Sequence, residues 1–445
     1  MEKLVRKAIR FLGKIFIFLL LFIAVVTAPI DRSLWKENPD YWQTFQYIDS
    51  VDLKPKLPPQ ELKAGWAKVN ITPSEPKKLV GFKPRGPYEA IRDSLFVKAI
   101  ALQVENQTVY IISYDLLLAP PEIVEAVHSK LGSATQLYFS ATHTHTGFGG
   151  WDSSLASRFI TGKFDENSFN KLVEKTILAI KTAGQNLERA SIGFGEADGS
   201  NWVKNRLDQE GKVDGLLRFL KIETQSGKSA ALVSFSAHST NIPSHILALS
   251  RDYPGVLTDK LEEKTVDFAL FCGGMMGSHK PKNPGLSDFA LAQKMGEELS
   301  LKIENNFHEI QLKDAIAVSY HHIPVKLPQA QLRLTQGLAV RSFVFNLLLG
   351  KLEASITYLQ LGDIVLLGMP CDFSGELLID GNLATIAKAN NLNLIITSFN
   401  GDYVGYITPD RYYDTKAKEE VRTLNWVGPN KGNYFIELAK RVLEK

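Results

Sequence analysis

The strongest run of apolar positions in the chain lies near its beginning. Five basic residues between Lys3 and Lys14 precede an uncharged run from Ile15 to Ile30. A basic flank before an apolar run is typical of an export signal or a signal anchor. Roughly 20 apolar residues cross a bilayer, and Phe11 to Gly13 extend the run toward that length. We expect residues 1–30 to form an uncleaved membrane anchor, with a cleaved signal peptide as the alternative.

The pattern then becomes polar. Residues 31–63 carry scattered aromatic side chains and end in a proline-rich spacer, so this stretch is expected to be a tether. Its Trp35, Tyr41 and Trp42 have two open interpretations. They lie at a membrane interface, where amphipathic rings are favoured, or they pack on the following domain.

Residues 64–445 alternate between strand-like and helix-like patterns. Apolar runs of strand length are bounded by turn residues, and other segments have apolar positions at helical spacing. This alternation predicts one α/β domain. The expected elements are hairpins over 99–119 (turn at 105–107) and 355–370 (tip at 362–363), helices over 120–132 and 168–187, and strands over 136–142, 230–238, 267–274 and 391–403.

Composition narrows the class of protein. The chain has 445 residues, 44% hydrophobic and 22% charged, with a formal net charge of +3. So small a charge, without a basic patch, argues against a nucleic-acid partner. Cys272 and Cys371 are the only cysteines. We interpret them as small buried residues, with a single disulfide as the alternative, since two cysteines make no disulfide framework.

The segment "YFSATHTHTGFGG", residues 138–150, places two of the nine histidines at the end of a predicted strand. In an extended chain, residues two apart project to the same side, so His143 and His145 are expected to point together. The glycines beside them allow close approach of backbone or substrate. The pattern fits a metal site, and it equally fits two hydrogen-bonded loop histidines.

Other predicted strands also end in residues that bind metals or move protons. His238 ends one such strand, Asp372 another, and Tyr403 and Tyr406 follow a third. Two imidazoles, one carboxylate and an oxygen donor suit zinc and leave a position for water. Taken alone, His238 is more typical of a buried core histidine and Asp372 of a helix cap.

Together these segments resemble the catalytic domain of the neutral/alkaline non-lysosomal ceramidase family. Its members are zinc amidases that cleave the N-acyl bond of ceramide. The resemblance implies a mixed-sheet zinc hydrolase domain, preceded here by the anchor helix. The matching blocks lie between about residues 64 and 430 and read "AGWAKVNITP", "IRDSLFVKAIAL", "IISYDLL", "SATHTHTGFGG", "VKNR", "SFSAHSTN", "SRDYPG", "MPCDFSGE", "DYVGYIT" and "TLNWVGP".

The resemblance also implies roles for single residues. One zinc per chain is expected, and a further calcium or magnesium ion is left open. Asp372 stands where the family has a glutamate, and Tyr406 is preferred to Tyr403 as the tyrosine ligand. The implied metal ligands are His143, His238, Asp372 and Tyr406, and the implied catalytic residues are His145, Arg206, Ser278 and Tyr403.

Two positions depart from the family pattern. In "GGMMGSHKPKNPG", Ser278 falls where the family has an aspartate and Lys280 where it has a serine, although a small shift gives Ser278 the serine's role. A family tyrosine maps near Lys418. These changes bear on the substrate more than on hydrolysis.

We therefore expect a membrane-tethered, zinc-dependent amidase that hydrolyses ceramide or a related N-acyl lipid through a zinc-activated water. Its catalytic domain would lie outside the cytoplasm, in the periplasm or at the cell surface, or be secreted if the signal is cleaved. One alternative is a zinc hydrolase of the same fold that acts on another amide or an ester. Another is a non-catalytic surface protein that keeps the fold for binding. The oligomeric state is left open.

Overall fold

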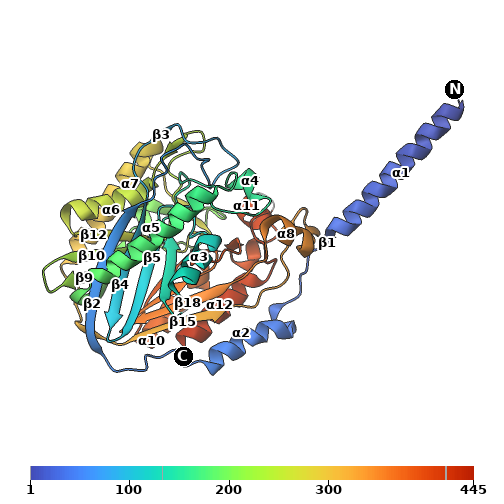
Figure 1. Cartoon of the computed structure of the whole chain (residues 1–445). Coiled ribbons are helices and arrows are strands. Elements are labelled where there is room, and N and C mark those ends of the chain that lie inside the picture. The colour runs from blue at the N-terminus through green and yellow to red at the C-terminus, as the bar shows by residue number, and fades with distance from the viewer. Residues whose placement is uncertain (1, 133, 416–417) are drawn as a thin grey trace.

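A computed structural model describes residues 2–132, 134–415 and 418–445. Two β-sheets stack face to face, and helices cover the outer face of each (Figure 1). The expected α/β fold with mixed sheets is therefore confirmed.

The larger sheet has nine strands in the order β12-β10-β9-β7-β2-β4-β5-β6, with β14 paired to β2. It contains the first predicted hairpin, since β4 and β5 pair antiparallel across the turn at Glu105. The pairs β5–β6 and β10–β12 are parallel, so the sheet is mixed. Its strands are β2 (Gln60–Asn70), β4 (Phe96–Val104), β5 (Gln107–Tyr114), β6 (Gln136–Ala141), β7 (Glu188–Asp198), β9 (Leu216–Thr224), β10 (Ser229–Phe235), β12 (Phe268–Gly273) and β14 (Ala315–Ile316).

The smaller sheet has four strands in the order β15-β18-β19-β21. The predicted hairpin at Gly362 joins β18 to β19, and β19 pairs parallel with β21. The Tyr138 hydroxyl in β6 hydrogen-bonds the Thr397 hydroxyl in β21 at 2.7 Å and so ties the two sheets together. The strands are β15 (Val318–Pro324), β18 (Ser355–Leu361), β19 (Ile364–Gly368) and β21 (Asn393–Thr397).

Alternation along the strands produces three apolar layers, because successive side chains point to opposite faces. In β5, Ile112 faces the helices while Ile111 packs between the sheets, and Leu366 in β19 meets it from the other side. One outer layer contains α3 (Pro121–Leu131), α5 (Glu166–Gln185), α6 (Asp252–Lys264) and α7 (Asp288–Phe307). The other contains α2 (Pro39–Ser50), α9 (Gly375–Asp380), α10 (Leu383–Ala389) and α12 (Lys431–Leu443).

The segment 31–63 does not run free between anchor and domain. It forms η1 (Trp35–Glu37) and α2, and the buried rings of Trp35, Tyr41 and Phe45 pack against Tyr434 of α12. The packing interpretation therefore holds for Trp35 and Tyr41, whereas Trp42 keeps an exposed edge. The apolar side chains of α2 recur at helical spacing, which gives the segment a face to bury.

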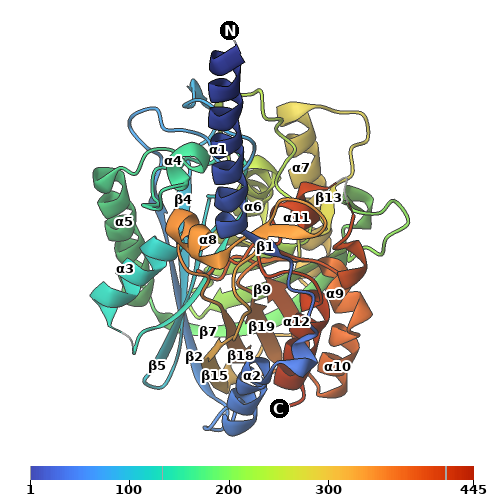
Figure 2. The same cartoon turned by 90° about the vertical axis from the view of Figure 1, so that its right-hand side faces the viewer.

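Helix α1 (Glu2–Val26) is the element expected to be an anchor. It projects from the body with no residue buried (Figure 1, Figure 2), and it is long and apolar enough to cross a membrane. Strand β1 (Thr27–Pro29) follows it directly and pairs with β17 (Leu338–Val340).

The remaining elements are short. They are β3 (Ala90–Ile91), β8 (Val203–Asn205), β11 (Ala248–Leu249), β13 (His279–Pro281), β16 (Leu332–Arg333), β20 (Asp372–Phe373), β22 (Tyr406–Ile407), α4 (Ser157–Ile160), α8 (Ser342–Leu349), α11 (Glu419–Arg422), η2 (Ser200–Trp202) and η3 (Asp410–Tyr412). Both cysteines are buried with free thiols, so the disulfide alternative is not realised.

Candidate metal centre

The candidate site lies where the ends of strands from both sheets meet. His143 follows β6 and His238 follows β10, both in the larger sheet. Asp372 belongs to β20, just beyond β19 of the smaller sheet, and Tyr406 begins β22. Strands β20 and β22 pair in parallel, with Asp372 and Tyr406 as register partners. The four predicted metal ligands are therefore brought together from four separate parts of the chain.

The two histidines of the opening motif do converge, but not along an extended strand. Strand β6 ends at Ala141, and His143 has a left-handed backbone with φ of 57°. The strand-alternation argument was therefore wrong in its mechanism, because a turn rather than an extended chain aims the rings. His143 Nε2 nevertheless lies 3.2 Å from His145 Nε2.

His143 is held on both sides. Its Nδ1 donates to the carbonyl of Leu117 at 2.6 Å, since a carbonyl oxygen only accepts. Its ring stacks on Phe399 at a centroid distance of 4.2 Å. These contacts fix the tautomer and leave the Nε2 lone pair free.

His238 has the same arrangement. Its Nδ1 faces two backbone carbonyls, those of Met276 at 2.8 Å and His279 at 3.1 Å. Its Nε2 lies 3.0 Å from the hydroxyl of Tyr406. Both imidazoles thus present Nε2 to one point.

Asp372 completes the arrangement. Its Oδ1 lies 3.6 Å from His143 Nε2 and 3.8 Å from His238 Nε2. Its Oδ2 accepts a hydrogen bond from the Tyr403 hydroxyl at 2.9 Å. Because Asp372 lies in a strand and Ser374 occupies the N-cap position of α9, the helix-cap alternative is excluded.

The side chains gathered at this point are suited to hold a cation. Asp372 Oδ1 is fully buried and has no hydrogen-bond partner in the described part of the chain. A buried carboxylate oxygen without a partner is costly unless a cation or donor faces it. Here two neutral ring nitrogens and a phenol surround it, which is the kind of ligand set that zinc takes. The residues therefore fit the metal that the resemblance implies.

In the absence of a bound cation, the buried site favours the neutral forms of His143, His238 and Asp372. Burial, aided by the charge of Arg206, lowers the pKa of His143 to about 3 and that of His238 well below its usual range. Burial raises the pKa of Asp372 to about 7. A bound cation would reverse this preference for Asp372, because it favours the carboxylate. Neutral imidazoles are already in the form that binds metal.

The other predicted site residues lie around this group. His145 is buried, and its ligand atom lies within 4.8 Å of those of His143 and His238, so it is itself placed as a possible ligand. The guanidinium carbon of Arg206 lies 5.9 Å from the ring centre of Tyr406. Ser278 is buried; its hydroxyl accepts a hydrogen bond from Ser374 at 2.5 Å, and its carbonyl accepts from the Arg206 backbone at 2.8 Å.

Sequence reasoning missed several contributors. Arg85, in the glycine- and proline-rich loop "GFKPRGP", donates to the carbonyl of His145 and lies over the ring of Phe82. Glu420 pairs with Arg206. The partner of His143 is the backbone carbonyl of Leu117, and a carbonyl partner has no sequence signal. Asp115, in the matching block "IISYDLL", accepts from the backbone of Phe96.

Comparisons with known proteins show which family and which fold the chain resembles. The family described as "Neutral/alkaline non-lysosomal ceramidase, N-terminal" matches residues 88–285. Among curated proteins, none matches the sequence.

Two solved structures have a similar fold. Neutral ceramidase from Pseudomonas aeruginosa is 17% identical with a TM-score of 0.73, over 86% of this chain and 75% of that one. A structure described as "Ceramidase complexed with C2" is 16% identical with a TM-score of 0.67, over 85% of this chain and 75% of that one. The resemblance read from the sequence is therefore confirmed: the chain is related to the neutral/alkaline non-lysosomal ceramidases through residues 88–285 and has the fold of neutral ceramidases.

Proposed function

We propose that this protein is a membrane-tethered, zinc-dependent amidase that hydrolyses the N-acyl bond of ceramide or a related N-acyl lipid. One observation carries the proposal. Asp372 Oδ1 is buried without a partner and faces the Nε2 atoms of both His143 and His238. The family match supports a ceramidase-like hydrolase as the setting for that group.

His143, His238, Asp372 and Tyr406 would hold the zinc. When bound, zinc supplies a Lewis acid and lowers the pKa of water from 15.7 to about 7. Tyr403 holds Oδ2 of Asp372 and so directs Oδ1 toward the two imidazoles. The backbone carbonyls at both Nδ1 atoms keep the rings in position.

Two further side chains act on the substrate amide in this proposal. Arg206 offers a fixed positive charge to the carbonyl oxygen as negative charge develops there. His145 supplies a proton to the leaving amine, because its Nε2 lies 3.2 Å from that of the predicted ligand His143 and so beside the proposed reaction centre. Ser278 positions Arg206, because its carbonyl holds the Arg206 backbone.

The protein would meet its lipid substrate at the membrane. Helix α1 is joined to α8 through Arg341, whose backbone donates to the Val26 carbonyl at 2.9 Å. Helix α8 lies beside the base of α1 (Figure 2). Exposed apolar side chains of α8 and of the neighbouring α4 segment form a group that we call the membrane face. It comprises Leu155, Phe159 and Ile160 at α4 and Phe343, Leu347 and Leu348 of α8.

The two parts of this face are connected, since the Ala156 backbone donates to the Leu348 carbonyl at 2.9 Å. Exposed apolar clusters of this kind mark contact with membranes or partners. Together with α1, the face supports a catalytic domain that rests on the bilayer outside the cytoplasm.

The test is metal content and hydrolysis in the full chain, purified in detergent. We expect about one zinc per chain and release of fatty acid from ceramide. His143→Ala and His238→Ala should lose both while remaining folded by circular dichroism. His308→Ala, at an exposed position after α7, is the matched control and should keep both. Full hydrolysis by a metal-free protein, or by either variant at the site, would exclude the mechanism.

A second candidate is a zinc hydrolase of this fold whose substrate differs from ceramide in its headgroup. The observation that favours it is the replacement of family residues by Lys280 and Lys418, both of which line a cavity with Arg206.

A further inference from the structure

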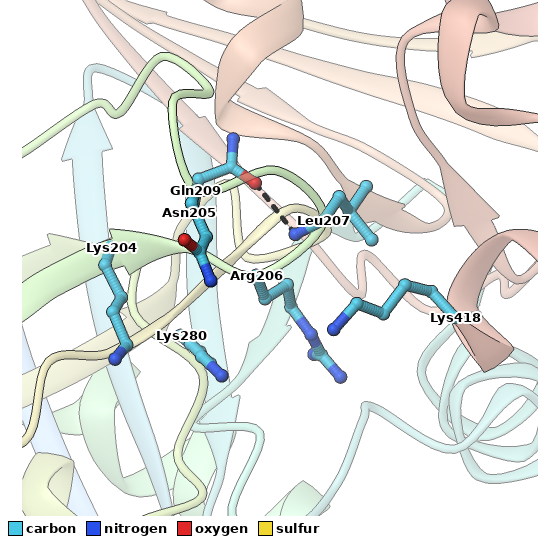
Figure 3. A pocket seen from close by; sticks show the side chains of 7 residues that line it. All are labelled: Lys204, Asn205, Arg206, Leu207, Gln209, Lys280 and Lys418. Atoms are coloured by element: carbon cyan, nitrogen blue, oxygen red, sulfur yellow. Dashed lines mark hydrogen bonds between the residues drawn. The ribbon is translucent and has the colours of Figure 1, made fainter. Parts of the chain in front are cut away.

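A cavity of about 380 Å³ opens beside Arg206. Lys204, Arg206, Lys280 and Lys418 line it together with three uncharged residues, Asn205, Leu207 and Gln209 (Figure 3). Lys204 and Lys280 extend from the β8–β13 ribbon, and Lys418 approaches from the segment that precedes α11 (Figure 3). Four cationic side chains from three segments thus share one concave space.

These charges are only partly neutralised. Glu420 pairs with Arg206, but none of the three lysines forms an ion pair within the described residues. Burial lowers the pKa of Lys280, the charges of Lys204, Lys418 and Arg206 lower it further, and the charge of Glu420 opposes them, so the four cations lie close enough to repel one another.

The arrangement is unfavourable in the protein alone. Lys204 and Lys280 are direct cross-strand partners in the antiparallel pair β8–β13. Like charges directly opposite one another destabilise a sheet. A departure from a local rule of this kind is commonly found at a functional site. An anion bound between the side chains of Lys204 and Lys280 would remove the repulsion between these two charges.

The cavity adjoins the candidate metal centre through one residue. Arg206 lines the cavity and also stands over the ring of Tyr406, the register partner of Asp372. Arg206 is therefore shared by the cavity and the surroundings of the metal centre, so a group bound in the cavity lies next to the proposed site of amide hydrolysis.

We propose that this cavity binds an anionic group of the substrate, a phosphate monoester carried near the N-acyl amide. The proposal rests on the proposed function and specifies its substrate class. A phosphate monoester carries a charge of about −1.5 to −2 at pH 7 and three acceptor oxygens. The three lysines, which form no ion pair within the described residues, offer the matching charge and donors. The natural substrate is then an N-acyl sphingoid lipid whose primary hydroxyl bears phosphate.

The concave shape favours a substrate group over the surface of an anionic bilayer. Arg206 and three lysines surround one concave space whose volume of about 380 Å³ suits a headgroup. A patch that read the bilayer would also affect substrates without charge, which gives the test its contrast.

The experiment compares two substrates of the full chain in neutral detergent micelles: ceramide and ceramide with a phosphate monoester on its primary hydroxyl. The readout is the ratio of kcat/KM for the phosphate ester to kcat/KM for ceramide. We expect the ratio to fall about tenfold in each of Lys280→Gln and Lys418→Gln, because each removes one charge-assisted contact. Lys302→Gln, an exposed lysine of α7, is the matched control and should keep the ratio.

Direct binding separates this proposal from the proposed function. If neither lipid is hydrolysed, the proposed function fails, but inorganic phosphate should still bind the wild type and bind Lys280→Gln at least about tenfold more weakly. An unchanged ratio with unchanged phosphate binding would overturn the cavity assignment. If the lysine variants lose kcat/KM equally for ceramide and for its phosphate ester, and only on anionic vesicles, the lysines contact the bilayer instead. That result would also overturn the cavity assignment.

Discussion

Individual residues of the site are fixed mainly through backbone contacts. His143 and His238 each donate from Nδ1 to a carbonyl, so their rings cannot turn without losing a buried hydrogen bond. His145 is held differently. Its ring lies 4.8 Å from that of Phe82, and its carbonyl accepts from Arg85. Its position therefore depends on the loop that carries these two residues.

Gly81 is the point at which that loop can be tested. It has φ of 107°, and a Cβ there would lie 2.7 Å from Cγ of His145. We expect Gly81→Ala to displace His145 without touching the predicted ligands, so zinc content should persist. A misplacement of about 1 Å costs on the order of 100-fold, which predicts a fall in kcat of about 10- to 100-fold with a smaller change in KM.

The control for this variant is Gly337→Ala, where nothing lies within 4 Å of the added atom. The test is to measure steady-state kinetics and zinc content in the wild type, Gly81→Ala and Gly337→Ala. An unchanged kcat in Gly81→Ala would show that the position of His145 does not limit the reaction.

At the scale of an element, helix α5 shows how charge supports the outer layer. Asp165 is its N-cap and accepts from the backbones of Asn167 and Ser168 at 3.1 and 3.4 Å. Its carboxylate also pairs with Lys77, which lies 88 residues earlier. The cap therefore joins the start of the helix to the loop that approaches the site.

Two substitutions separate the cap from the charge. Asp165→Ala removes both and should lower the free energy of unfolding by about 1 kcal/mol at pH 7, whereas Asp165→Asn keeps a good cap. The contact with Lys77, together with hydrogen bonds from Ser168, lowers the pKa of Asp165 from 3.8 to about 2. The stabilisation is then complete above pH 3.8 and is lost as the pH falls through about 2.

Urea denaturation of the full chain in mild detergent, repeated between pH 6 and pH 2, measures this dependence. The difference between wild type and Asp165→Asn should shrink as the pH falls. A difference that stays constant across this range would show that the Lys77 contact contributes nothing to folding.

For the whole molecule, the sequence predicted elements better than their arrangement. Both hairpins and helix α5 were recognisable from apolar spacing, and the polar strand ends predicted the side chains that meet at the candidate metal centre. The division into two stacked sheets was not, because the apolar runs of β6 and β19 look alike and alternation does not say which strands share a sheet. The left-handed turn at His143 and the packing of Phe45 on Tyr434 likewise depend on contacts distant in sequence.

The membrane face belongs to the scale of the whole molecule, since it combines α4 and α8 and lies beside α1. The side chain of Leu347 in α8 is 65% exposed, and that of Leu301 in α7 is 46% exposed. If the face rests on the bilayer, a polarity-sensitive dye at Leu347→Cys should become blue-shifted when the full chain is reconstituted in vesicles. The same dye at Leu301→Cys should report water. Both natural cysteines are buried, which leaves the introduced thiol as the reactive one.

Quenching by iodide gives the decisive comparison, because the ion enters water but not the hydrocarbon layer. We expect the dye at Leu347→Cys to be protected in vesicles and quenched in a detergent-free truncation that lacks residues 1–26 and is kept away from lipid. The dye at Leu301→Cys should be quenched in both. Strand β1, which directly follows α1, pairs with β17, so an α1 helix that spans the membrane would by itself hold α8 close to the bilayer. Equal quenching at the two positions in vesicles would then mean that α8 stays in water and that α1 is the sole contact with the membrane.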